Sequence, residues 1–257
     1  MIKAVLKLAF FIIIFNPFTV HALEVLPSLV ETGEKGIEGM AYYTNISQEI
    51  VFDIQTTTVT STGEQYTDTV RIYKEYFIKK ALIRISLHRS PGYDIFFLGG
   101  VNRASLKEKG LSEEMSGGWT GYTLGFGAKY ILLGDLTTLP QTVLNVKISR
   151  DLSPLTEYTP PSRGSLDSVL TVYQVQVSAI VSKKFSIFLP YTGLEGYYGR
   201  AAWEKKSSKS EREEGRISGL SMLAGIKVIF TPALSLSIEG TFLGDASYAL
   251  GMNILFR

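Results

Sequence analysis

The chain has 257 residues, no cysteine and a formal net charge of +2. The absence of cysteine excludes a disulfide framework, a thiolate metal site and a thiol nucleophile, and the near-zero charge argues against a nucleic-acid binder. Only 19% of the residues are charged, while tyrosine and phenylalanine are abundant, so the distribution of apolar residues along the chain has to decide the structural class.

Residues 1–22 have the pattern of a secretory signal peptide. A positively charged start is followed by an uninterrupted apolar run over residues 8–15 and by the small residue Ala22 at a suitable cleavage point. We expect cleavage after Ala22, with an uncleaved anchor helix as the alternative. This segment carries two lysines and no acid, so Lys+Arg falls from 26 to 24 and balances the 24 acidic residues.

Apolar and polar residues alternate through most of the remaining chain, residues 23–257, which we expect to form one domain. In residues 234–242, Leu236 and Ile238 share one parity while Ser237 and Glu239 share the other, and such a period of two is typical of β-strands. The same alternation predicts strands near residues 36–46, 69–80, 93–103, 119–130, 141–150, 169–181, 185–202, 222–230, 234–242 and 246–256. Pro190 cannot donate to a ladder, so it predicts a bulge nearby.

The predicted connectors alternate in length. Residues 47–68, 104–117, 151–164 and 204–215 form long polar stretches, and most of the others are short. Short turns on one side and long loops on the other are typical of outer-membrane barrels. We therefore predict an all-β fold, a single antiparallel transmembrane β-barrel of about ten strands, with eight or twelve possible. A soluble extracytoplasmic β-sandwich or lipocalin-like carrier is the alternative, because a period of two does not separate a lipid-facing side from a core-facing one.

The last predicted strand resembles the closing strand of bacterial outer-membrane β-barrels, in which alternate apolar residues end in an aromatic. The residues that carry this resemblance are Tyr248, Leu250, Met252, Ile254 and Phe256, with Arg257 following. The resemblance is to small Gram-negative, porin-like outer-membrane barrel proteins. It implies a place in the bacterial outer membrane, contact with its lipid and lipopolysaccharide, and recognition of this strand by the barrel-assembly machinery.

A barrel of about ten strands has a narrow interior. The polar residues that we expect to face it are Lys129, Asn145, Lys147, Gln174, Gln176, Lys227 and Glu239. Three lysines against one glutamate favour a weakly anion-selective constriction. The alternative is an interior closed by ion pairs and hydrogen bonds, and it is preferred because little space is available.

The sequence offers little support for catalysis. His88 is the only histidine after the signal peptide, and Pro91 and Gly92 follow it closely, so we expect a solvated turn residue on the periplasmic side. We expect no enzyme, metal or cofactor. Basic residues of the 204–215 stretch could instead bind lipopolysaccharide phosphates, and these are Lys205, Lys206, Lys209 and Arg212.

Two functions follow for a membrane barrel of this kind. The first is a structural role or limited passive passage of solutes. The second is surface binding or adhesion through the long loops.

Overall fold

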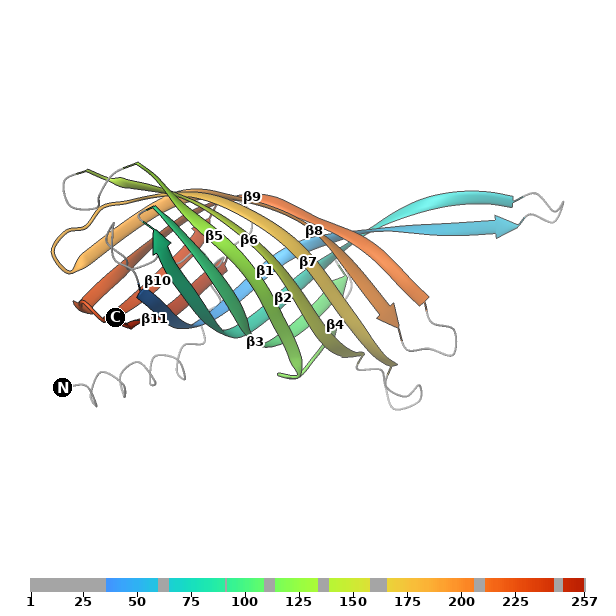
Figure 1. Cartoon of the computed structure of the whole chain (residues 1–257). Helices are drawn as coiled ribbons and strands as arrows, with labels where there is room; N and C mark the ends of the chain where they lie inside the picture. Colours follow the sequence, from blue (N-terminus) through green and yellow to red (C-terminus); the bar gives the residue numbers. More distant parts are fainter. Residues whose placement is uncertain are drawn as a thin grey trace.

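The described residues form one antiparallel sheet of eleven strands that closes into a ring, drawn in Figure 1. The computed structural model describes residues 36–59, 65–90, 92–108, 114–133, 139–157, 166–205, 211–242 and 247–256. The strands are β1 (Gly36–Val59), β2 (Gln65–Ser90), β3 (Tyr93–Glu108), β4 (Glu114–Ser116), β5 (Gly121–Leu133), β6 (Gln141–Glu157), β7 (Leu166–Ser182), β8 (Phe188–Lys205), β9 (Glu211–Thr231), β10 (Leu234–Phe242) and β11 (Ser247–Phe256). The predicted signal peptide, residues 1–22, lies outside the described residues.

The ring closes because the first and last strands pair, with Ile37 opposite Phe256. The described parts of the chain contain no helix long and apolar enough to cross a membrane. The first and last described residues, Gly36 and Phe256, lie beside the tight turn at residues 232–233. Short turns mark the periplasmic end of an outer-membrane barrel, so we name this the inner end and the opposite one the outer end.

The strands are strongly staggered around the ring. One row of paired residues runs from Ala41 through Ile83, Gly99, Leu124, Arg150, Tyr173 and Arg200 to Arg216 of β9. In the other direction the row runs from Ala41 through Met252 and Leu236 to Val228 of β9. The two rows reach β9 twelve residues apart, and a stagger of this size requires tilted strands, as Figure 1 shows.

The side chains are distributed inside out compared with a soluble protein. Large apolar side chains face outward, including Ile83 at 62% and Leu220 at 68% exposed, while Lys227 and Asn145 face inward at 0% and 1%. Outward aromatics gather toward both edges of this apolar band, with Tyr93, Tyr130, Phe230 and Phe256 at the inner edge and Tyr122, Tyr173, Tyr198 and Phe242 toward the outer edge. An apolar exterior with aromatic girdles is the signature of a transmembrane barrel.

The first hairpin differs from the sequence prediction. Residues 47–68 were expected to be a loop, but β1 and β2 have 24 and 26 residues and pair as far as Val59 opposite Gln65. This segment is rich in threonine and also contains isoleucine and valine, and the branched side chains of all three favour extended backbone. Beyond Phe52 and Lys74 no other described strand pairs with the hairpin, so it projects past the rest of the barrel (Figure 1).

The bulge expected near Pro190 does not occur, because β8 keeps a continuous register with both β7 and β9 there. Lys183 N donates to the Pro190 carbonyl at the end of the β7–β8 ladder. The nitrogen and carbonyl of a strand residue point to the same side, so the Pro190 nitrogen also faces Lys183. Because proline has no N–H, this pair at the end of the ladder forms one hydrogen bond instead of two.

The ring becomes narrower toward its outer end. The last two strands are short, with 9 residues in β10 and 10 in β11. Beyond them Val51 and Phe52 of β1 pair directly with Arg216 and Gly215 of β9. On the other side β4 replaces β5 between β3 and β6. The inner ring thus contains β1, β2, β3, β5, β6, β7, β8, β9, β10 and β11, and the outer ring contains β1, β2, β3, β4, β6, β7, β8 and β9.

Candidate functional site

The interior of the outer ring is filled by apolar side chains, which we call the outer apolar cluster. Its buried members are Ile46, Ile50, Phe52, Tyr76, Ile78, Ala104, Leu106, Leu155, Leu170, Val172, Tyr197, Ala201, Trp203 and Ile217, with Met115 packed against them. Every strand of the outer ring contributes to it. The rings of Phe52 and Trp203 meet edge to face at 6.2 Å, and Lys74 Nζ lies 3.9 Å from the centre of the Trp203 ring.

A chain of polar side chains, the middle polar network, links β2, β3, β5 and β6 below this cluster. Lys80 Nζ lies 3.0 Å from Asp151 Oδ2, and both side chains are almost fully buried. Thr123 donates to Asp151 over 2.6 Å. Asn102 donates to Thr123 over 3.1 Å and accepts from Ser153 over 2.9 Å. The buried charge of Lys80 is therefore compensated within the barrel wall.

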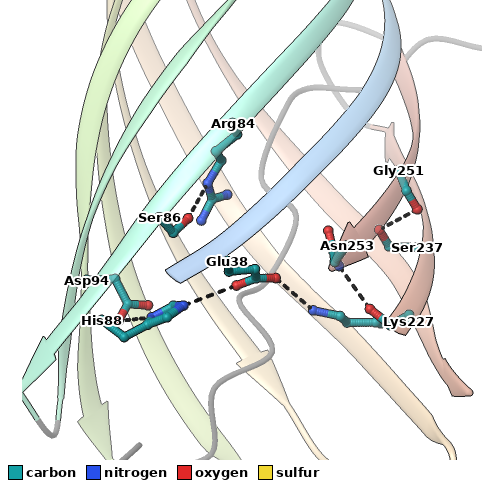
Figure 2. Close-up of polar contacts among 10 residues, drawn as sticks. Glu38, Arg84, Ser86, His88, Asp94, Lys227, Ser237, Gly251 and Asn253 are labelled. Atoms are coloured by element: carbon teal, nitrogen blue, oxygen red, sulfur yellow. Dashed lines mark hydrogen bonds and ion pairs between the residues drawn. The ribbon is translucent and has the colours of Figure 1, made fainter. Parts of the chain in front are cut away.

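The inner end is crossed by a second set of charges, the inner ionic network (Figure 2). Glu38 of β1 lies between His88 of β2 and Lys227 of β9, with His88 Nε2 at 3.5 Å and Lys227 Nζ at 3.7 Å from its two oxygens. His88 Nδ1 lies 2.7 Å from Asp94 Oδ1. Close by, Arg84 Nε donates to Ser86 over 3.0 Å. The carboxylate of Glu38 thus bridges strands on both sides of β1.

The structure places all of the predicted lumen residues on the inward face. Lys129, Asn145, Lys147, Gln174, Gln176, Lys227 and Glu239 are each 5% exposed or less. Gln176 donates to Glu195 of the next strand. Their influence on the passage of solutes remains a prediction.

The expectation for His88 was wrong. It lies within β2, its side chain is 1% exposed, and it contacts two carboxylates inside the barrel. The sequence prediction ended this strand at residue 80, although the alternation continues. Lys80, Arg84 and His88 share the inward parity, while Ile83 faces outward. If the predicted strand had been extended along this alternation toward Gly92, it would have included Arg84 and His88.

The acidic partners inside the barrel were also missed. Asp151 falls in a stretch that was expected to be a loop, but β6 continues to Glu157. Glu38 and Glu195 lie in predicted strands, but neither was predicted to face the interior. Among the described side chains that are buried, the cations are Lys74, Lys80, Arg84, Lys129, Lys147 and Lys227, and the acids are Glu38, Asp151, Glu195 and Glu239. The excess of two cations is the same as for three lysines against one glutamate, but most of the buried cations can now be matched by a buried acid.

The predicted surface residues lie at the outer end of β8 and β9. Lys205 Nζ is 2.6 Å from Glu213, and Arg212 contacts Glu204 at 3.8 Å and Glu214 at 3.2 Å. Lys206 and Lys209 lie outside the described residues. The part of these residues in lipopolysaccharide binding stays a prediction.

The predicted assembly signal lies on the outer face of β11. Ile254 and Phe256 are 38% and 58% exposed, and Tyr248, Leu250 and Met252 share their parity. The row is continuous with the apolar exterior. Recognition of this row by the barrel-assembly machinery stays a prediction.

Within the described residues, no group of three or more histidine, aspartate or glutamate side chains is arranged to hold a metal ion. The first hairpin carries an exposed ion pair, in which Arg71 Nε lies 3.0 Å from Asp53 Oδ1. The hydrogen bond and negative charge of Asp53 raise the pKa of Arg71 above its already high ordinary value.

No protein-family model and no curated protein matches the chain. It is similar to the translocator domain of the autotransporter NalP from Neisseria meningitidis, with a TM-score of 0.47, 12% identity and 87% of this chain and 90% of that chain covered. It is also similar to the outer membrane protease OmpT from Escherichia coli, with a TM-score of 0.49, 11% identity and 91% and 99% covered. For Ail of Yersinia pestis the TM-score is 0.35, with 10% identity and 87% and 100% covered. These identities are too low for any activity to be carried over.

The closed antiparallel ring, the apolar exterior with its aromatic girdles and the polar interior agree on one class. All backbone groups of such a sheet are paired within the ring, which is what a membrane-spanning sheet requires. The chain is an integral β-barrel protein of the bacterial outer membrane.

Proposed function

We propose that this protein is a closed structural barrel that anchors its first hairpin at the cell surface and does not conduct solutes. The observation that carries the proposal is the outer apolar cluster, to which every strand of the outer ring contributes. An eight-stranded ring is just wide enough for side chains to fill. The narrow outer ring and its apolar filling therefore support a closed barrel.

Apolar side chains obstruct a pore more effectively than their size suggests. A hydrophobic constriction expels water and so presents a barrier to ions. Phe52 and Trp203, with exposed fractions of 0% and 4%, lie within this constriction. Passage would require both aromatic rings to move away from each other.

The charges below the cluster support the same function. Lys80 is paired with Asp151, and Lys227 with Glu38. Charges that compensate one another in the wall attract a passing ion less than unpaired ones would. His88, enclosed between two carboxylates, likewise supports a structural role rather than a hydrolytic one.

Planar-bilayer recordings test the proposal. The wild-type barrel is expected to give no discrete conductance steps, while the double variant Phe52→Ala/Trp203→Ala is expected to give steps because the constriction is removed. Phe97→Ala, on the outer face at 57% exposed, is the matched control and should stay closed. Discrete steps from the wild-type protein would show that the barrel conducts and would contradict the proposal.

The projecting hairpin favours the surface role. From Asp53 onward on β1, and up to Tyr73 on β2, it extends past all other described pairing partners. An epitope inserted at residues 60–64 should be labelled by antibody on intact cells. Labelling only after permeabilisation of the outer membrane would mean that the hairpin faces the periplasm.

A further inference from the structure

Two arginines lie directly opposite each other on the outer face of the barrel. Arg200 of β8 pairs with Arg216 of β9, and both side chains are exposed. Like charges in this arrangement destabilise a sheet. Neither guanidinium has a carboxylate partner among the described residues, since the ion pairs of this region join other side chains. The pair therefore lacks a counter-charge from the described wall.

The two arginines line a hollow of about 570 Å³ on this face. Tyr173 and Tyr198 form its lower wall at 50% and 51% exposed. Two acids also line it, but Asp53 is paired with Arg71 and Glu214 with Arg212. The space beside Arg200 and Arg216 is therefore electropositive and large enough for a small anionic group.

The hollow lies at the border between the apolar band and the charged outer end. On β9, Leu220 faces outward at 68% exposed, whereas Glu214 and Arg212 follow Arg216 toward the outer end. On β8, Tyr198 lies below Arg200, and Glu204 lies above it. Aromatic residues mark the interface between hydrocarbon and headgroups, so the two arginines lie at headgroup depth in the outer leaflet.

A third arginine extends the same row. Arg150 of β6 is paired with Tyr173, which in turn is paired with Arg200. The guanidinium of Arg150 lies 5.3 Å from the centre of the Tyr173 ring. Tyr173 thus lies between Arg150 and Arg200, which both face the lipid. The planar guanidinium of arginine is well suited to bidentate contacts with phosphate.

We propose that Arg200 and Arg216 form a binding site for the phosphate group of an outer-leaflet glycolipid, with Tyr173 and Tyr198 contacting the lipid below it. The charge complementarity, the hollow and its depth in the membrane together select a lipid phosphate over a soluble anion. The inference does not depend on whether the lumen is closed.

The test measures binding of lipid A by native mass spectrometry of the folded, detergent-solubilised full-length protein. The double variant Arg200→Gln/Arg216→Gln should bind bisphosphorylated lipid A about tenfold or more weakly, because two charge-assisted contacts are lost. Arg200→Lys should give a smaller loss, since the charge remains but the fork is removed. Dephosphorylated lipid A should bind wild type and double variant alike.

A matched control is available on β2 and β3. Lys79 and Arg103 also pair across strands and are exposed, but they do not line the hollow. Lys79→Gln/Arg103→Gln should leave lipid A binding within about twofold of wild type. Folding of every variant is checked by the shift in gel mobility on heating.

Three outcomes would overturn the site. The double variant could retain wild-type affinity, the control could lose as much affinity as the double variant, or inorganic phosphate alone could bind as tightly as the lipid. The last result would identify a site for a soluble anion instead of a lipid.

Discussion

The two ends of this barrel are filled in opposite ways. The outer ring contains the aromatic and aliphatic side chains of the outer apolar cluster, whereas the inner ring is crossed by the ion pairs around Glu38. The outer ring has fewer strands, because β10 and β11 end early and β1 joins β9 directly. A narrow ring can be filled by close packing alone, and a wider one needs long side chains that reach each other.

This difference predicts different sensitivities. Packing energy depends on volume and shape, while the stability of a buried ion pair depends on both partners being present. The comparison can be tested through the free energy of unfolding of the barrel from lipid vesicles, measured by urea titration.

The largest effect is expected in the outer apolar cluster. Phe52→Ala should lower the free energy of unfolding by about 3–5 kcal/mol, because a buried aromatic is removed from a packed site. Phe52→Leu keeps most of the volume and should cost less than half as much. Equal losses for the two variants would show that packing volume does not determine stability at this end.

The inner ionic network should respond to charge. Glu38→Gln leaves Lys227 and His88 without their shared carboxylate, and we expect a loss of about 3 kcal/mol. The double variant Glu38→Gln/Lys227→Gln should recover part of this loss, because it also removes the uncompensated cation. Additive losses in the double variant would show that the two residues do not interact energetically.

A smaller effect is expected where the ring narrows. A Cβ at Gly215 would lie 2.8 Å from Ile50 Cγ2 and 2.9 Å from Phe52 Cδ1, so Gly215→Ala should cost about 1–3 kcal/mol through overpacking. At Gly196 the atom nearest to such a Cβ is Leu220 Cδ1, at 3.8 Å, and Gly196→Ala should be tolerated. If Gly215→Ala left the free energy of unfolding unchanged, the close packing of β1 against β9 at this position would not contribute to stability.

The smallest effect is expected in the projecting hairpin. Asp53→Asn breaks the ion pair with Arg71, whose two side chains are 37% and 65% exposed. Exposed pairs contribute little because water screens them, so the urea midpoint should not change measurably. A clear decrease would indicate that the hairpin is coupled to the barrel through more than its backbone.

The sequence was sufficient for the class of fold. Alternation in residues 234–242 and 246–256 predicted β10 and β11 closely, because each strand has one side against lipid and one against the interior. The inward position of Lys227 and Glu239 followed from the same rule. Strand ends were less accurate, since threonine-rich residues 47–59 are polar but favour extended backbone.

Only the tertiary structure determined which side chains meet inside the barrel and where the ring narrows. Parity places Lys80 and Asp151 inside, but their contact depends on the stagger of the strands, which joins residues far apart in the chain. The narrowing of the ring and the close approach of β1 to Gly215 also arise from pairing between distant strands. Alternation is a local property set by the pleat of each strand, whereas register and closure belong to the whole sheet.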